Sequence, residues 1–258
     1  MTAVPGALAD PSTVSDEDVT FAGRDGTQVT GYLARPATGD EPRGAVIVLH
    51  EAMGLNAHIK DVVRRVAGLG YTALGPDLYT REGIPPEGDR DAIFATMFSQ
   101  ADAQLVGDLQ GAADHLHGLD EVNGKVACIG FCSGGRQTLL FAANTTSLAV
   151  AADCWGGFTR RANADQETTE LRPVPPIDQL EGLHCPLLVV VGGQDQNPSP
   201  QDGKAIVARA AELGKDARLS VYEDAGHAFF ADYRPNYVEA AAHRLWDELK
   251  DLWAEHLR

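Results

Sequence analysis

The segment Gly130-Phe131-Cys132-Ser133-Gly134 carries the clearest sign of chemistry in this chain of 258 residues. A strand-like run leads into it and a helix-like run leads out, which is the context of a G-x-nucleophile-x-G turn. The glycines are needed because a side chain at either position would hit the neighbouring strand or helix. The start of the helix contributes partial positive charge, which favours a thiolate at Cys132 and can hold an oxyanion through free N–H groups. Taken alone, the motif also fits a glycine turn with a buried cysteine.

An acid and a histidine follow later strands in the order that a hydrolase triad requires. Asp195 comes after the apolar run 186–191, and His227 comes after the run 217–222. Nucleophile, acid and base occur in this order in α/β-hydrolases. The pattern predicts that Cys132 attacks, that His227 moves the proton, and that Asp195 orients the imidazole. Each of the two later residues also has a plainer interpretation, as a turn acid or a hydrogen-bonded loop histidine.

The residues His50, Glu51 and Ala52 stand where a central strand is expected to end. In this arrangement the loop donates a second oxyanion N–H, that of Ala52, and Ser133 donates the first. A carboxylate such as Glu51 near a thiol can take its proton or oppose its ionisation. A solvated loop acid is the alternative. The zinc pattern H-E-x-x-H is excluded because residue 54 is glycine.

The sequence predicts neither a metal nor a nucleotide cofactor. The other histidines lack ligand spacing, and His115 and His117, two apart on a predicted helix, face different directions. No G-x-G-x-x-G motif follows a predicted strand, and no Walker sequence is present. We therefore expect chemistry on a small molecule by side chains and backbone alone.

Charge and composition restrict the partners and the compartment. With 21 Lys and Arg against 37 Asp and Glu, the formal charge of −16 argues against nucleic acid and anionic membranes. An anionic small molecule would need a local arginine. No apolar stretch approaches the roughly 18 residues of a membrane span, and residues 1–14 read as a flexible leader without a secretion signal. The four cysteines form no C-x-x-C pair, so we expect the reducing cytoplasm.

Short β-branched runs alternate with helix-period segments, so residues 15–258 are expected to form one α/β domain. The pattern predicts a mainly parallel central sheet with helices on both faces and a ligand site at the carboxyl ends of its strands. Strands are predicted at 17–22, 28–34, 45–50, 71–75, 125–130, 147–154, 186–191 and 217–222. Helices are predicted at 57–69, 99–117, 202–213 and 236–256, and after the cysteine turn.

Turn and cap signals refine this pattern. Residues 23–26 are predicted to join the first two strands into an antiparallel hairpin, and Asn56 to cap the first helix. Residues 81–97, rich in Gly, Pro and acids, are predicted as a surface loop, and residues 157–182 as a polar insertion.

Together these residues resemble the dienelactone hydrolase family (carboxymethylenebutenolidases) of the α/β-hydrolase superfamily. The resemblance covers about residues 15–255 and rests on HEAMGLN at 50–56, PDLYTR at 76–81, GFCSGG at 130–135, GGQD at 192–195 and AGHAF at 225–229. It implies a triad of Cys132, His227 and Asp195. It also implies that Glu51 interacts with the resting thiol and deprotonates it when substrate binds, and that Arg81 binds a substrate carboxylate.

The chain departs from the family pattern at two places. The family's second carboxylate-binding arginine would fall four residues after the histidine, where this chain has Ala231. Arg234, three residues further, could replace it if the loop folds inward. The insertion at 157–182 carries three arginines, Arg160, Arg161 and Arg172. Both departures affect the identity of the substrate and leave the reaction class intact.

We therefore expect a cysteine-dependent hydrolase that opens a lactone or ester through a thioester intermediate, without a cofactor. One alternative is a general carboxylesterase or thioesterase with the same triad. The other is a non-catalytic ligand-binding protein in which Cys132 is a redox-sensitive thiol.

Overall fold

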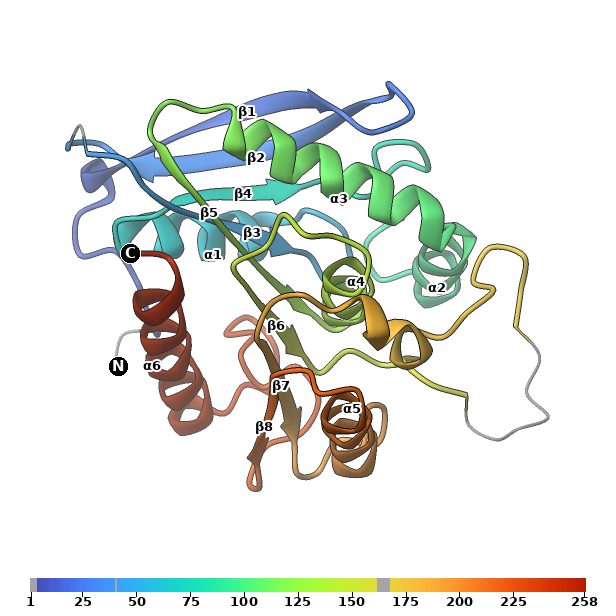
Figure 1. The fold of residues 1–258 in the computed structure, drawn as a ribbon. Helices are drawn as coiled ribbons and strands as arrows, with labels where there is room; N and C mark the ends of the chain where they lie inside the picture. Colours follow the sequence, from blue (N-terminus) through green and yellow to red (C-terminus); the bar gives the residue numbers. More distant parts are fainter. Residues whose placement is uncertain (1–3, 40, 162–167) are drawn as a thin grey trace.

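A computed structural model of the chain describes residues 4–39, 41–161 and 168–258, and an eight-stranded sheet forms its centre (Figure 1). The strand order is β1-β2-β4-β3-β5-β6-β7-β8. Strand β2 is antiparallel to both of its neighbours, and all other adjacent strands are parallel, which confirms the predicted α/β-hydrolase sheet. The strands are β1 (Val14–Ala22), β2 (Gln28–Pro36), β3 (Arg43–Leu49), β4 (Thr72–Pro76), β5 (Val122–Phe131), β6 (Val150–Cys154), β7 (Leu187–Gly192) and β8 (Ala217–Tyr222).

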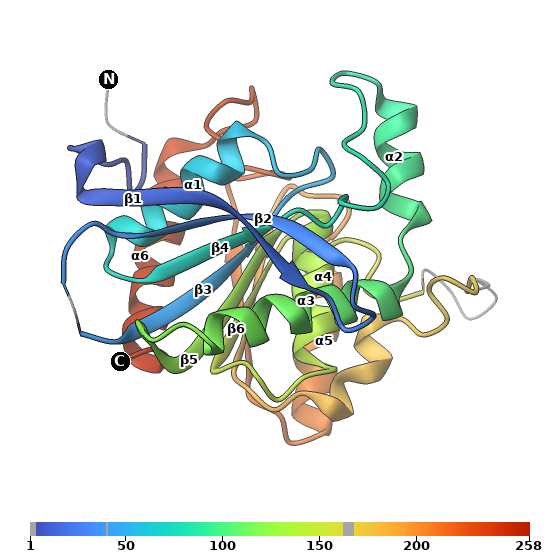
Figure 2. The same cartoon turned by 90° about the horizontal axis from the view of Figure 1, so that it is seen from above.

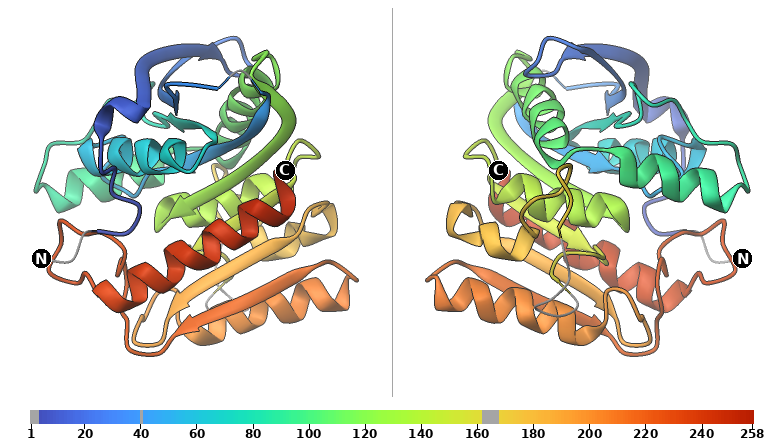
Figure 3. Two further views of the ribbon diagram at one scale, coloured as in Figure 1. Left: turned by 90° about the vertical axis from the view of Figure 1, so that its left-hand side faces the viewer. Right: turned by 90° about the vertical axis from the view of Figure 1, so that its right-hand side faces the viewer.

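Helices cover both faces of the sheet, as predicted (Figures 1 and 3). Helices α1 and α6 pack on one face, and α3, α4 and α5 pack on the other. None of the helices within the described residues is long and apolar enough to cross a membrane. The helices are η1 (Pro11–Thr13), α1 (Ala57–Gly68), α2 (Arg90–Ser99), α3 (Asp102–His117), α4 (Ser133–Ala142), η2 (Pro176–Gly182), α5 (Pro200–Glu212) and α6 (Glu239–His256).

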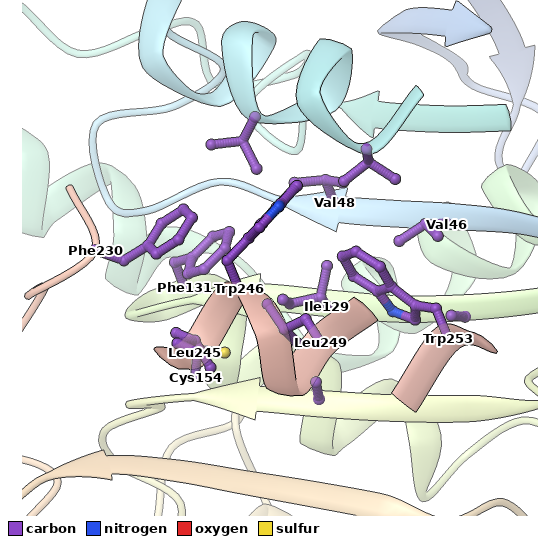
Figure 4. Packing of buried hydrophobic residues seen from close by; sticks show 14 of the residues in the cluster. Val46, Val48, Ile129, Phe131, Cys154, Phe230, Leu245, Trp246, Leu249 and Trp253 are labelled. Atoms are coloured by element: carbon purple, nitrogen blue, oxygen red, sulfur yellow. The ribbon is translucent and has the colours of Figure 1, made fainter. Parts of the chain in front are cut away.

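The central strand β3 is apolar and buried from Gly44 to Leu49 because both of its faces are covered. Val46 and Val48 lie on the side of α6, close to Trp246 and Trp253 (Figure 4), and Ile47 lies on the side of α3 and α4. The two tryptophan rings meet edge to face with centroids 6.0 Å apart. Burying one aliphatic side chain such as Val46 or Ile47 stabilises the folded state by roughly 1.5–3 kcal/mol. The apolar side chains on both faces therefore hold the sheet between its helix layers.

Two local signals read from the sequence are confirmed. Strands β1 and β2 pair as an antiparallel hairpin from Val14 opposite Pro36 to Ala22 opposite Gln28. The Asn56 side chain accepts a hydrogen bond from the Ile59 N–H at 3.1 Å and caps α1. This cap fixes the helix that follows the loop after β3.

The prediction of a surface loop over residues 81–97 is wrong in its second half, where α2 begins. Asp89 caps this helix by accepting a hydrogen bond from the Ala92 N–H at 3.0 Å. Of the large apolar side chains on α2, Met97 is buried, whereas Phe94 and Phe98 are exposed. The helix therefore lacks the buried apolar stripe that periodicity analysis detects.

Two other predicted segments have only partial descriptions. Of the insertion at 157–182, residues 162–167 lie outside the described part of the chain, and η2 forms its end. Of the predicted leader at residues 1–14, residues 4–14 are described, and Val14 already belongs to β1. Within it the Pro5 carbonyl accepts a hydrogen bond from Arg65 at 3.3 Å, and Gly6 lies against Trp246.

A substitution of Gly130, the last glycine before the cysteine turn, should be strongly destabilising. A Cβ at Gly130 would lie 2.1 Å from the Gly134 carbonyl oxygen and 2.7 Å from the Thr138 hydroxyl. Because α4 would have to move away from β5, we expect Gly130→Ala to lose about 3 kcal/mol of unfolding free energy in urea titrations. The control is Gly107→Ala on α3, where the nearest atom lies 3.6 Å away and a helical alanine is preferred by about 1 kcal/mol. Equal urea midpoints for Gly130→Ala and the unsubstituted chain would contradict this close packing.

Candidate functional site

The predicted site residues gather at the carboxyl ends of the parallel strands. Cys132 directly follows β5, Asp195 follows β7, His227 follows β8, and Ala52 follows β3. Helix α2 lies at the same end of the sheet (Figure 2). A cavity of about 440 Å³ is lined by all four of these residues and by Ser133.

The backbone at Cys132 is strained. Its φ and ψ are 57° and −115°, in the left-handed half of the map that residues with a Cβ rarely adopt. Its carbonyl accepts hydrogen bonds from the N–H groups of Gly135 and Arg136 at 3.0 and 3.2 Å, and its own N–H donates to Cys154 at 3.0 Å. These contacts hold the turn, so the strain persists and the side chain projects from the start of α4.

Positive φ angles concentrate around this cavity. Among the described residues other than glycine, four have φ > 0: Cys132, Trp155, Phe158 and Ala228. Cys132 and Phe158 line the cavity, and Ala228 follows His227 directly. Strained backbone of this kind persists only where the surroundings fix it, and it is typical of functional sites.

His227 is oriented by a buried acid. Its Nδ1 lies 2.7 Å from Asp195 Oδ2, and Asp195 Oδ1 accepts a hydrogen bond from the Asn197 N–H at 3.0 Å. The acid is 5% exposed. Because Nδ1 faces the carboxylate, Nε2 remains for the Cys132 thiol, which lines the same cavity and lies close enough to raise the pKa of the ring. The geometry therefore brings the three predicted residues together in the order thiol, imidazole, carboxylate.

The pKa of His227 depends on both neighbours. Burial alone lowers it, but the hydrogen bond with Asp195 and the hydrogen bond and charge of Cys132 raise it to about 10. We expect Cys132→Ala to lower this pKa in an NMR titration of the imidazole, because only Asp195 then supports the cation. His58, whose pKa is lowered by burial, is the internal control and should not move.

The same shift affects folding. A folded-state pKa above the unfolded value near 6.5 gives stability that is complete below about pH 6.5 and is lost as the pH rises toward 10. A His227 pKa that is unchanged by Cys132→Ala would contradict the contact between thiol and ring.

The loop after β3 is held so that the Ala52 N–H can face the cavity. Leu78 N–H donates to His50 Nε2 at 3.2 Å, so Nδ1 carries the proton and donates to the Glu51 carbonyl at 2.7 Å. Tyr79 donates to the Ala52 carbonyl at 3.0 Å. Among the described residues, no acceptor is recorded for the N–H of Ala52 or Ser133. Two free donors thus flank the cavity next to Cys132.

His50 is therefore a structural histidine, and burial lowers its pKa. In the described ranges, no group of three or more His, Cys, Asp or Glu side chains is arranged to hold a metal ion.

Glu51 is a buried, partnered carboxylate and not a solvated loop acid. It is 1% exposed, and its Oε2 accepts a hydrogen bond from the Tyr233 hydroxyl at 3.1 Å. Arg234 Nη2 lies 3.3 Å from the same oxygen, and Arg234 Nε donates to the Tyr233 oxygen at 2.9 Å. Burial, together with the Glu51 charge, raises the pKa of Tyr233. The loop after His227 does fold inward, as the replacement of the second family arginine by Arg234 would require. The Arg234 guanidinium, however, binds Glu51 and does not line the cavity.

Arg81 is placed away from the cavity. Its guanidinium forms ion pairs with Asp108, which is buried, and with Asp25 at 2.8 Å, and it is not among the cavity-lining residues. The guanidinium is thus bound by two carboxylates of the protein itself, and a role for Arg81 in binding a substrate carboxylate stays a prediction. Its partners lie far from it in the sequence, so no local pattern could reveal them.

Several cavity residues were missed by the sequence reasoning. Phe94 and Met97 come from α2, Arg136 from the first turn of α4, and Arg172 from the insertion. Arg136 could have been identified from the sequence, because it lies four residues after Cys132 in the first turn of the predicted helix, and residues at this spacing are neighbours. The α2 residues had no such signal, because their segment read as a loop.

Comparison with known proteins matches the chain to one family over nearly its whole length. Residues 29–257 match the model described as "Dienelactone hydrolase family". A protein of Escherichia coli strain K12 named "Putative carboxymethylenebutenolidase" is 35% identical over 238 residues, which cover 90% of this chain and 84% of that protein. A Bradyrhizobium protein named "Probable 2-oxo-3-(5-oxofuran-2-ylidene)propanoate lactonase" is 30% identical over 227 residues, covering 87% and 88%.

A solved structure supports the same relationship. The crystal structure named "Putative Dienelactone Hydrolase" from Klebsiella pneumoniae has a TM-score of 0.84 and 32% sequence identity to this chain. The match covers 93% of this chain and 98% of that one.

Proposed function

We propose that this chain, which belongs to the dienelactone hydrolase family and is a hydrolase of ester or lactone bonds, uses Cys132 as its nucleophile and forms a thioester intermediate. The observation that carries the proposal is the contact series from the Cys132 thiol through the His227 ring to Asp195 at one cavity. An imidazole held by a buried carboxylate next to a strained thiol is suited to acyl transfer.

In the first half of the reaction the acyl group moves to sulfur. The Cys132 thiolate attacks the carbonyl carbon, and the π electron pair of the carbonyl moves to its oxygen. The N–H groups of Ala52 and Ser133 hold this oxyanion, and each such donor is worth roughly 3 kcal/mol of barrier. The carbon–oxygen bond of the ester then breaks, the His227 imidazolium protonates the leaving oxygen, and a thioester remains.

In the second half water replaces sulfur. The neutral His227 imidazole takes a proton from water as the oxygen attacks the thioester carbonyl, and the same N–H groups hold the new oxyanion. When the carbon–sulfur bond breaks, the thiolate returns and the carboxylic acid leaves. The enolate that leaves an enol-lactone is a stable anion, so even a weakly basic thiolate can displace it. Enol-lactones are therefore favoured as substrates over amides.

We also propose Glu51 as the proton acceptor for the resting thiol. Glu51 directly precedes Ala52 in the chain, and its carboxylate is buried. Arg234 lies close enough to interact with the charges of both Glu51 and Cys132. Tyr233 and Arg234 would hold the carboxylate in place during this transfer.

Two measurements separate the proposed lactone hydrolase from its alternatives: the preference for a lactone over a simple ester, and the effect of alkylating Cys132 on turnover. We expect the enzyme to hydrolyse p-nitrophenyl acetate and a dienelactone, and one equivalent of iodoacetamide on Cys132 to abolish both activities. A general esterase with the same triad would show no preference for the lactone. Rapid alkylation of a protein that turns over neither substrate would instead show a thiol sensor and contradict the proposal.

We propose a reducing compartment, the cytoplasm, as the place of action. All four cysteines are free thiols, and Cys128, Cys154 and Cys185 are buried. Burial raises the pKa of Cys128 to about 12 and that of Cys185 to about 11, so these two are poor nucleophiles.

A further inference from the structure

Arg172, from the insertion after β6, lines the same cavity as Cys132 and His227. Its Nη2 donates to the backbone carbonyl of Met97 at the end of α2, and its guanidinium lies 4.9 Å from the centre of the Phe98 ring. Its Nε is buried and, among the described residues, has no hydrogen-bond partner. The side chain is therefore held in position with part of its bonding capacity unused.

Among the described residues Arg172 forms no ion pair of its own, although the charge of Asp102, which is bound to Arg136, acts on it. Arg136 forms two hydrogen bonds with the Asp102 carboxylate, at 2.7 and 3.0 Å, and the exposed Arg90 lies over the Phe94 ring. Within the described ranges, no carboxylate lies within ion-pair distance of Arg172. A partly buried guanidinium without a counter-ion is costly, and a bound anion would offset that cost.

The cation persists at neutral pH. Burial and the nearby Arg136 charge lower the pKa of Arg172 to about 10, which leaves it protonated while indicating an unfavourable setting for a positive charge. In a chain of net charge −16, a partly buried guanidinium that lines the cavity and has an unused N–H is a local site for an anion.

We propose that Arg172, in place of Arg81 and Arg234, binds the substrate carboxylate that the family resemblance implies, at a distance from the scissile bond. This inference rests on the function proposed for Cys132. A planar carboxylate fits a guanidinium better than it fits an ammonium. Phe94, Met97 and Phe158 supply the apolar wall for the part of the substrate between the two ends. Arg81 and Arg234 are already bound to acids of the protein itself.

The test compares esters that differ in one charged end. The probes are the mono-p-nitrophenyl esters of succinate, glutarate and adipate, each paired with the p-nitrophenyl ester of the unbranched acid of equal carbon number. We expect the unsubstituted enzyme to prefer the best-fitting carboxylate ester. In Arg172→Gln its kcat/KM should fall about 10- to 100-fold, mainly through KM, while the neutral ester changes less than about threefold.

Three further variants separate the anion site from general effects. Arg172→Lys retains the charge and should keep part of the preference. Arg218→Gln, which removes an exposed arginine on β8, should leave both substrates unchanged. Arg81→Gln should keep the preference for the carboxylate ester. Loss of the preference in Arg81→Gln, or an unaltered preference in Arg172→Gln, would overturn the assignment.

Equal loss of both esters in Arg172→Gln would also overturn it, since that is the result of a structural role. If Arg172→Gln does not fold, inhibition of the unsubstituted enzyme decides: glutarate should compete with the neutral ester, and its diamide should not. Absence of inhibition by glutarate would count against the site. The neutral ester assayed with Cys132→Ser tests the proposed nucleophile separately, because that reaction does not need Arg172.

Discussion

Replacing Cys132 with serine should lower kcat for p-nitrophenyl acetate at least about 1,000-fold. The strained turn presents the side chain to His227, whose ring is held by Asp195 and whose pKa is raised to about 10. A serine hydroxyl at the same place is a much poorer nucleophile, because this arrangement is matched to a thiol. The measurement is steady-state release of p-nitrophenol from both enzymes at equal concentration.

The matched control is Cys185→Ser, a second cysteine just before β7 that does not line the cavity. We expect its kcat to stay within about threefold of the unsubstituted enzyme, since only packing changes. Hydrolysis by Cys132→Ser at the original rate would show that another group attacks the ester.

Replacing His227 with alanine should produce a loss of similar size, about 10³- to 10⁴-fold in kcat, because both halves of the reaction pass a proton through this ring. Asp195→Asn should cost less, since the imidazole remains and only its orientation and charge support are weakened. Their effects should not add in the double variant, because the two residues act through one hydrogen bond of 2.7 Å.

Added imidazole provides the control for His227→Ala. The free base can enter the cavity left by the side chain and should restore part of the rate to this variant, but none to Cys132→Ser. Full activity of His227→Ala without imidazole would remove this residue from the mechanism.

The parts of the fold that the sequence predicts well are those with buried, continuous apolar runs. Residues 44–49 of β3 and 126–131 of β5 lie between two helix layers, so these stretches are buried without interruption and are easily recognised. The positions of Asp195 and His227 follow from the same logic, since each lies in the loop after a parallel strand. Helix α2 was missed because Phe94, which lines the cavity, and Phe98 are both exposed and form no buried apolar stripe with Met97.

Arginine roles could not be predicted from short motifs. Arg81 stands in a segment that resembles the family, yet its partner Asp108 is 27 residues away in the sequence and becomes visible only in the folded chain. Arg234 reaches Glu51 across 183 positions (234 − 51). Arg172 is positioned by the end of α2, in a segment whose composition predicts a surface loop.

The most direct test of Cys132 as the nucleophile is the mass of the enzyme quenched in acid during turnover of p-nitrophenyl acetate. We expect one acetyl group on the peptide that contains Cys132, which neutral hydroxylamine removes as it does other thioesters. The adduct should be absent from Cys132→Ser. An acetyl group on a different side chain, or an initial burst of p-nitrophenol with Cys132 unmodified, would contradict it.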